Sequence, residues 1–116
     1  MDLDEANHRL FVGFRQPAKV IIFDTESGKV VASLDCAGDA DDLFYDRQRK
    51  RIYLSGGEGF VDVFTQQDAD HYALNIKVPT AAGARTSLLV PPLHRFFLAV
   101  PHRGTQAAEI RVYDVQ

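Results

Sequence analysis

The chain has 116 residues, 46% of them hydrophobic and 25% charged, which is typical of a single soluble globular domain and excludes a disordered or collagen-like chain. Sixteen acidic residues outnumber 13 basic ones, so the formal net charge is −3 and we expect no nucleic-acid partner. No apolar stretch approaches the roughly 18 residues of a membrane span, no basic leader is present, and the single Cys36 excludes an internal disulfide and a cysteine-rich zinc site.

The first third of the chain predicts three strands and the stub of another. The stub covers residues 1–4, and the strands cover residues 9–13, 20–24 and 29–34. Between the last two strands, Asp24 is suited to capping a turn through its side chain, and Gly28 supplies a positive φ. These residues form a first unit, 1–38, that lacks most of its opening strand.

The middle third predicts a complete set of four strands, at residues 43–45, 51–55, 60–64 and 72–78. In the third of these, alternation places Asp62 on the face opposite to Val61 and Val63. The glycine-rich residues 55–59 lie between two strands, which indicates a hairpin turn, because a phosphate-binding loop would need a helix after it. This unit covers residues 39–83.

The last third, residues 84–116, predicts strands at 87–90, 96–100 and 108–115 and stops before a fourth. No segment has the 3.6-residue apolar period of a helix. The three units also repeat: residues 4–13 align with 46–55 at an offset of 42, and residues 43–55 align with 88–100 at an offset of 45. A period of about 40 to 50 residues is that of a β-propeller blade.

The predicted fold is therefore all-β, an incomplete β-propeller of about three four-stranded antiparallel blades. The first blade lacks most of its inner strand, the second is complete, and the third lacks its outer strand. Propellers typically close with four to eight blades, so we do not expect this chain to close alone. Either it is part of a larger propeller, or several copies assemble a ring.

Residues 9–12 followed by 20–34, with Asp24 and the pair Gly28-Lys29, resemble the YVTN-type repeat of WD40-like β-propellers. The sequence departs from that repeat at Thr65 and at Pro91-Pro92. The resemblance covers the whole chain and implies the last three blades of a seven-bladed bacterial propeller of largely unknown function, exported in many cases to the periplasm or the cell exterior. No haem-ligand motif of the wider superfamily is present.

Ligand contacts are expected from the loops at one end of the blades, because a rigid scaffold positions binding residues on its loops. The predicted polar funnel would take a small anionic or metal-assisted ligand, and the alternative interpretation is that these charges are merely solvated. The residues assigned to it are Arg15, Asp41, Asp42, Glu58, Arg85, His102 and Arg103. Asp39 belongs to the same loops, and neighbouring blades would present Asp39, Asp41 and Asp42 at places near the axis equivalent to that of Arg85, but Asp39 is not assigned to the ligand.

No catalytic residue, metal ligand or cofactor is predicted. The acidic residues 39–42 lack the spacing of a calcium-binding loop, and the four histidines show no metal-binding motif. Cys36 is interpreted as a structural thiol.

The favoured function is a non-catalytic scaffold or binding module within a larger propeller. A second hypothesis is a segment of a propeller enzyme, of the metal-dependent hydrolase or lactonase type, with its site in the axial funnel. A third is a self-associating unit that forms a ring through its open blade edges. Its partners would be the rest of the propeller, another copy, a small ligand or a protein, without insertion into a membrane. The ligand, the reaction and the compartment stay open.

Overall fold

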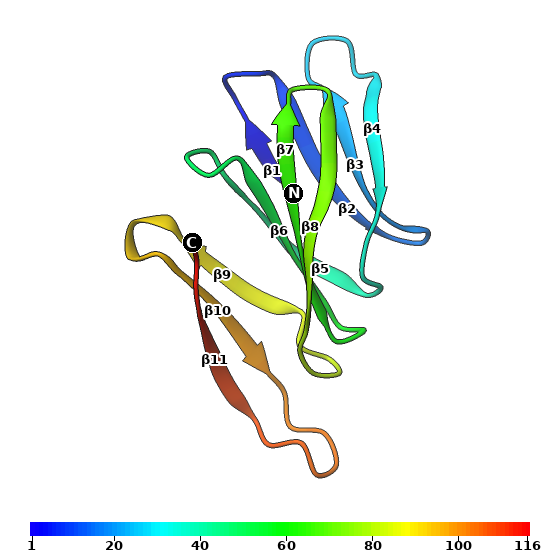
Figure 1. Ribbon diagram of the computed structural model, residues 1–116. Helices are drawn as coiled ribbons and strands as arrows, with labels where there is room; N and C mark the ends of the chain where they lie inside the picture. Colours follow the sequence, from blue (N-terminus) through cyan, green and yellow to red (C-terminus); the bar gives the residue numbers. More distant parts are fainter.

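The computed structural model describes all 116 residues as three antiparallel sheets (Figure 1). The first sheet has four strands in chain order: β1 (Asp2–Asp4), β2 (Arg9–Arg15), β3 (Ala18–Asp24) and β4 (Val30–Asp35). The second repeats that order with β5 (Ala40–Asp46), β6 (Arg51–Gly56), β7 (Phe60–Asp68) and β8 (His71–Pro79). The third has three strands, β9 (Thr86–Val90), β10 (Arg95–Val100) and β11 (Glu109–Asp114).

The all-β prediction is confirmed, and each predicted strand is present with ends that differ by a few residues. The only helical element is a 3₁₀ turn, η1 (Pro91–Leu93), which contains two consecutive prolines and lies in the connection between β9 and β10. No sheet closes on itself. The structure contains no helix with the length and apolar character that a membrane crossing requires.

The turn between the first two strands of each sheet ends in a residue with left-handed backbone. These residues are His8, Lys50 and His94, with φ values of 56°, 54° and 55°. The offset between His8 and Lys50 is the predicted 42. The predicted turn at Asp24 also forms: its Oδ1 accepts a hydrogen bond from the Glu26 N–H at 2.9 Å, and Gly28 has a φ of 74°.

The predicted offset of 45 between the second and third units is wrong by one for the strands. In the second sheet Leu43 pairs with Leu54, and in the third sheet Ser87 pairs with Leu98. Leu43 and Ser87 therefore occupy equivalent positions, at an offset of 44. The pairing of β5 shifts between Ala40 and Asp42, so Asp41 is an extra residue, a β-bulge. A shift of one residue exchanges the two faces of a strand, and Leu43 is accordingly buried whereas Leu88 is 54% exposed.

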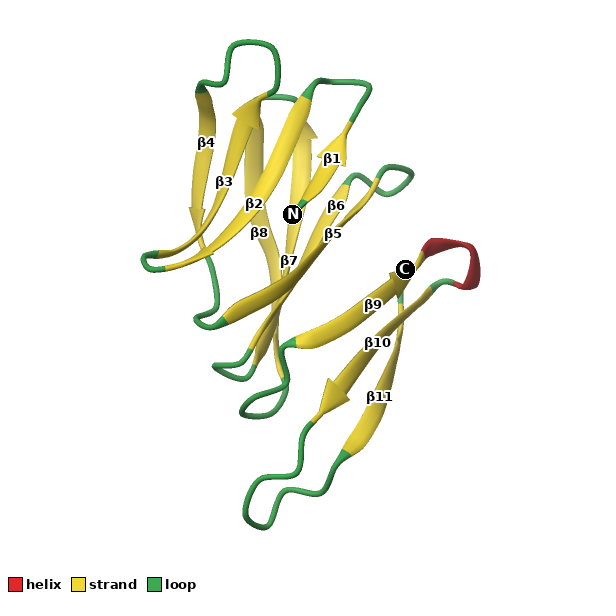
Figure 2. Cartoon of the chain, turned by 180° about the vertical axis from the view of Figure 1, so that it is seen from behind, coloured by secondary structure: helices red, strands yellow, loops and turns green.

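The sheets stack face to face in chain order (Figures 1 and 2). Alternation along β6 explains how the middle sheet buries both faces, because Ile52 and Leu54 point to the first sheet and Tyr53 points to the third. The core between the first two sheets contains Phe11, Val20, Ile22, Leu43, Ile52, Leu54, Phe64 and Tyr72. The core between the last two contains Tyr53, Val61, Val63, Leu89, Phe96, Leu98 and Val100.

A buried polar network joins the first two sheets. The carboxylate of Asp4 accepts hydrogen bonds from the side-chain amides of Asn7 and Gln66, each at 2.8 Å. Gln66 also accepts a hydrogen bond from the Tyr45 hydroxyl at 2.7 Å, and its amide lies 3.1 Å from the Tyr72 hydroxyl. Burial raises the pKa of Asp4, but the hydrogen bonds outweigh it and leave that pKa below its usual value. We call these residues the Asp4 network.

Asp62 points away from Val61 and Val63, as predicted. Its carboxylate accepts a hydrogen bond from the Ala37 N–H at 2.7 Å and lies 3.2 Å from the Lys77 ammonium group. This buried carboxylate therefore fixes the segment that leads from the first sheet into the second.

Candidate functional site

The loops that follow the second strand of every sheet, and the fourth strand of the first two sheets, lie along one end of the stack (Figure 1). They are the connections β2–β3, β4–β5, β6–β7, β8–β9 and β10–β11, and we call this end the loop end. All seven residues that were predicted to contact a ligand lie at or beside it. The opposite end carries the turns with His8 and His94.

Asp39 is at the centre of the charged groups at the loop end. Its Oδ2 accepts a hydrogen bond from Arg85 Nε at 2.9 Å and forms an ion pair with Arg85 Nη2 at 2.7 Å. Its Oδ1 lies 3.7 Å from Nη1 of Arg15. The hydrogen bond from Arg85 holds the pKa of Asp39 below its usual value; burial opposes this, and the positive charges of Arg85, Arg15 and Arg103 reinforce it.

Sequence reasoning did not assign Asp39 to the ligand. Asp39 adopts left-handed backbone, with φ of 56°, a conformation in which aspartate is enriched among non-glycine residues. The repeat predicted that Asp39 and Arg85 lie near each other in neighbouring blades, but it did not predict which of the acidic residues 39, 41 and 42 pairs with Arg85, nor the contact with Arg15.

The bulge at Asp41 positions the guanidinium of Arg15. Arg15 Nε donates to the carbonyl of Ala40 at 2.8 Å, and Nη2 lies 3.3 Å from Oδ1 of Asp41. The Arg15 side chain is 56% exposed, so its ion pairs are solvated and weak. The guanidinium is therefore free to exchange one carboxylate for another anion.

Two glycines make room for the charged side chains. A Cβ on Gly57 would lie 2.0 Å from Oδ2 of Asp39, so a larger residue there would have to displace the Asp39 carboxylate. Gly83 has a φ of 80°, and a Cβ on it would lie 2.8 Å from Cζ of Arg103. The Arg103 side chain thus lies directly against the backbone of the β8–β9 loop.

The Arg103 loop is itself fixed. Arg103 and Gln106 form an isolated backbone bridge, with N–H to carbonyl distances of 3.0 and 2.7 Å. The Gln106 side-chain amide donates to the carbonyls of Ala82 and Pro101 at 3.0 and 2.8 Å. The loop is therefore fixed within itself and held to the β8–β9 loop.

Three of the predicted residues have other surroundings. Asp42 accepts a hydrogen bond from the Ser87 N–H at 2.8 Å and so joins the second sheet to the third. Glu58 accepts one from the Gly38 N–H at 2.6 Å. His102 is exposed and makes no hydrogen bond or ion pair. Of the predicted residues, the structure thus pairs Arg15 and Arg85 with Asp39 and Arg15 with Asp41, and it places the positive charge of Arg103 nearby.

The guanidinium groups at the loop end have the charge and the hydrogen-bond donors that bind anions. A guanidinium offers several N–H donors in a fixed plane, which matches the geometry of carboxylates and phosphates. No three His, Cys, Asp or Glu side chains lie close enough together to hold a metal ion. Cys36, half-buried near Asp62, has a pKa raised to about 11 by burial, so its thiol stays protonated at neutral pH.

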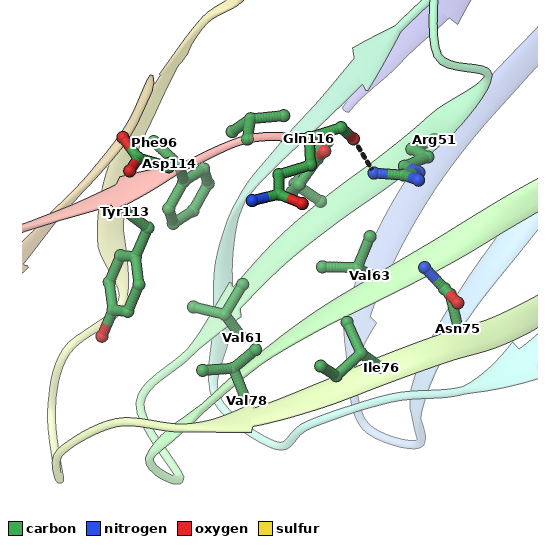
Figure 3. A pocket seen from close by; sticks show the side chains of 12 residues that line it. Arg51, Val61, Val63, Asn75, Ile76, Val78, Phe96, Tyr113, Asp114 and Gln116 are labelled. Carbon is green, nitrogen blue, oxygen red and sulfur yellow. Dashed lines mark hydrogen bonds between the residues drawn. The ribbon is translucent and has the colours of Figure 1, made fainter. Parts of the chain in front are cut away.

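A cavity of about 360 Å³ lies away from the loop-end cluster, between β8 and the end of the chain (Figure 3). Val61, Val63 and Val78 form one side, and Tyr113 lies opposite them. The cavity exists because the third sheet has no fourth strand to cover this part of β8. The sequence predicts that the third sheet stops before a fourth strand, whereas the cavity on β8 was not predicted.

No protein-family model matches the sequence, and no curated protein matches it.

Proposed function

We propose that this chain is a non-catalytic binding module whose three sheets are consecutive blades of a β-propeller, similar to those with YVTN-type repeats. Two features support the propeller interpretation. Each sheet is an antiparallel meander in chain order, and successive sheets stack face to face in the same order. Closing such a stack takes at least four sheets, so the complete propeller would include sheets beyond these three.

The ligand that we propose for the loop end is a small anion with a carboxylate or phosphate group. The observation that carries this proposal is the pairing of Arg15 and Arg85 with the carboxylate of Asp39, close to the positive charge of Arg103. With Asp41, which also pairs with Arg15, the cluster holds three guanidinium groups and two carboxylates. Arg85 holds Asp39 firmly, while the exposed Arg15 and the neighbouring Arg103 can turn to a second anion. The bulge, Gly57 and Gly83 keep these groups in place before the ligand arrives.

Titration of the ¹⁵N-labelled protein with citrate and with inorganic phosphate, at constant ionic strength, tests this proposal. We expect saturable amide shifts at Arg15, Arg85 and Arg103, and binding that weakens about tenfold in Arg15→Ala or Arg103→Ala. Arg47→Ala is the matched control, because Arg47 is an exposed arginine in the β5–β6 turn at the opposite end. The absence of saturable shifts with both probes, or an equal loss in the Arg47 variant, would refute the proposal.

A further inference from the structure

The outward face of the third sheet is apolar and uncovered. Leu89, Phe96 and Leu98 point to the second sheet and are buried, so their neighbours along the strands point outward. Leu88 and Val112 lie opposite Phe97 on its two sides, and Ile110 lies opposite Ala99. Leu88, Ile110 and Val112 are 54%, 63% and 55% exposed.

The outward face of the third sheet has the same apolar pattern as the face of the second sheet on which the third sheet packs. By strand pairing, Leu88, Phe97 and Val112 occupy the positions in the third sheet that Phe44, Tyr53 and Val63 occupy in the second. Those residues contact the third sheet. The outward face of the third sheet is therefore built to receive another sheet of the same kind.

The outward face of the first sheet is the complementary surface. Phe11, Val20 and Ile22 point to the second sheet, which leaves Leu3, Leu10, Val12, Ile21 and Phe23 on the other side. Strand pairing places Leu3, Leu10, Val12 and Phe23 in the registers of Leu89, Phe96, Leu98 and Tyr113. Those are the side chains with which the third sheet packs on the second.

An arginine stands at the start of the second strand of each sheet, and in the first two sheets it contacts the sheet that follows. Arg9 donates to the carbonyl of Ala69 at 3.0 Å and to Asp70 at 2.7 Å, in the β7–β8 turn of the next sheet. Arg51 donates to the carbonyl of Gln116, at the end of the third sheet. Each arginine therefore reaches across the interface to the sheet that follows.

Arg95 is the third member of this series and has no sheet to reach. It pairs with Asp114 of its own sheet, and its side chain is 45% exposed. At the other end of the stack, the β3–β4 turn carries Glu26, which is 73% exposed and lies 3.5 Å from His8 of its own sheet. Like Asp70 in the β7–β8 turn, Glu26 is an acidic residue between the third and fourth strands of a sheet. The two open faces thus match in charge as well as in apolar pattern.

We propose that the outward face of the third sheet binds the outward face of the first sheet of a second copy, with Arg95 against Glu26. The contact joins different faces of the two copies, so it must close into a ring or continue as a filament. Two copies supply six sheets, within the four to eight of closed propellers, whereas three would supply nine. The occupant is therefore one further copy, in a closed dimer. This rests on the propeller arrangement of the sheets and is independent of the ligand.

Light scattering after size exclusion, from about 1 µM to about 100 µM, tests the proposal. The expected mass is twice the 13.0 kDa of the chain. A monomer throughout that range, or a mass above the dimer, would overturn it. Anion binding by a monomer would leave the proposed function intact, so the two failures are distinguishable.

Variants at exposed positions test which faces meet. Leu3→Arg and Val112→Arg should each be monomeric, and a 1:1 mixture should form dimers through the one intact pair of faces. Leu74→Arg, with a leucine 50% exposed on the second sheet, is the control and should remain dimeric. A Leu3→Arg protein that stays dimeric would overturn the proposal, because it would mean that like faces meet. Circular dichroism checks that each variant is folded.

The charge pair gives a second readout. Arg95→Glu and Glu26→Arg should each raise the dimer dissociation constant about tenfold, since each places like charges opposite one another. The combined variant restores the pair in reversed polarity and should recover most of the affinity. Equal weakening in the combined variant would show that these residues do not face one another.

Discussion

Replacing Gln66 with leucine tests the Asp4 network that joins the first two sheets. Gln66 is 4% exposed and bonds three partners, the carboxylate of Asp4 and the hydroxyls of Tyr45 and Tyr72. Leucine fills similar space but offers no polar atom. The substitution leaves Asp4 with Asn7 alone and leaves the Tyr45 hydroxyl without its acceptor.

The expected loss follows from these unmade bonds. A buried polar group without its partner costs about 1–3 kcal/mol, and a charged one costs more. With one carboxylate and one hydroxyl affected, we expect the free energy of unfolding to fall by about 3 kcal/mol. That loss would lower the melting temperature by roughly 10 °C in a domain of this size.

Urea denaturation followed by circular dichroism measures this change. Gln67→Leu is the matched control, because Gln67 is the next residue of the same strand and is exposed. The control should change the free energy of unfolding by less than about 0.5 kcal/mol. A loss below about 1 kcal/mol for the Gln66 variant, or equal losses for both, would refute the reasoning.

Three further predictions concern single groups. Gly57→Ala should lower the free energy of unfolding by about 1–3 kcal/mol, because its Cβ would displace the Asp39 carboxylate; urea denaturation measures this, and an unchanged midpoint would contradict it. The pKa of Asp4 is lowered on folding, so its contribution is present above its unfolded value of about 3.9 and is lost as the pH falls through the folded value. Stability measured between pH 5 and pH 2 should therefore fall less steeply in Asp4→Asn, and parallel curves would count against this. Cys36 should react with iodoacetamide at pH 8 about 100-fold more slowly in the folded than in the urea-unfolded protein; equal rates would show that its pKa is not raised.

The sequence predicts the strands well because their signals are local. Alternation in residues 60–64 defines both faces of β7, and the turns at Asp24 and Gly28 follow from side-chain capping and positive φ. The 3₁₀ turn follows from the prolines that precede Leu93. Such features depend on neighbouring residues, which the sequence displays directly.

Features that depend on distant residues could not be predicted. The bulge at Asp41 shifts the register of β5, and a comparison of similar residues cannot show which of two adjacent positions is inserted. The role of Asp39 depends on arginines from two other loops. Asp42 carries the same charge as Asp41 but binds the backbone of the third sheet, because its side chain points to the opposite side.

Stacking of the sheets in chain order is the central claim, and a disulfide between two sheets tests it most directly. The hydroxyls of Ser55 in β6 and Ser87 in β9 lie 2.7 Å apart across the interface of the second and third sheets. In a Cys36→Ser background, Ser55→Cys with Ser87→Cys should form a disulfide quantitatively under mild oxidation. The closed loop spans 32 positions, which corresponds to about 3–4 kcal/mol of added stability.

The control pairs Ser33→Cys with Ser87→Cys, since Ser33 is exposed on the first sheet, opposite Ile21 on its outward face. Mass spectrometry of the oxidised monomer should find the bond in the first pair alone, with a higher melting temperature. Free thiols in the Ser55 and Ser87 variant, or equal crosslinking in the control, would contradict the stacked arrangement.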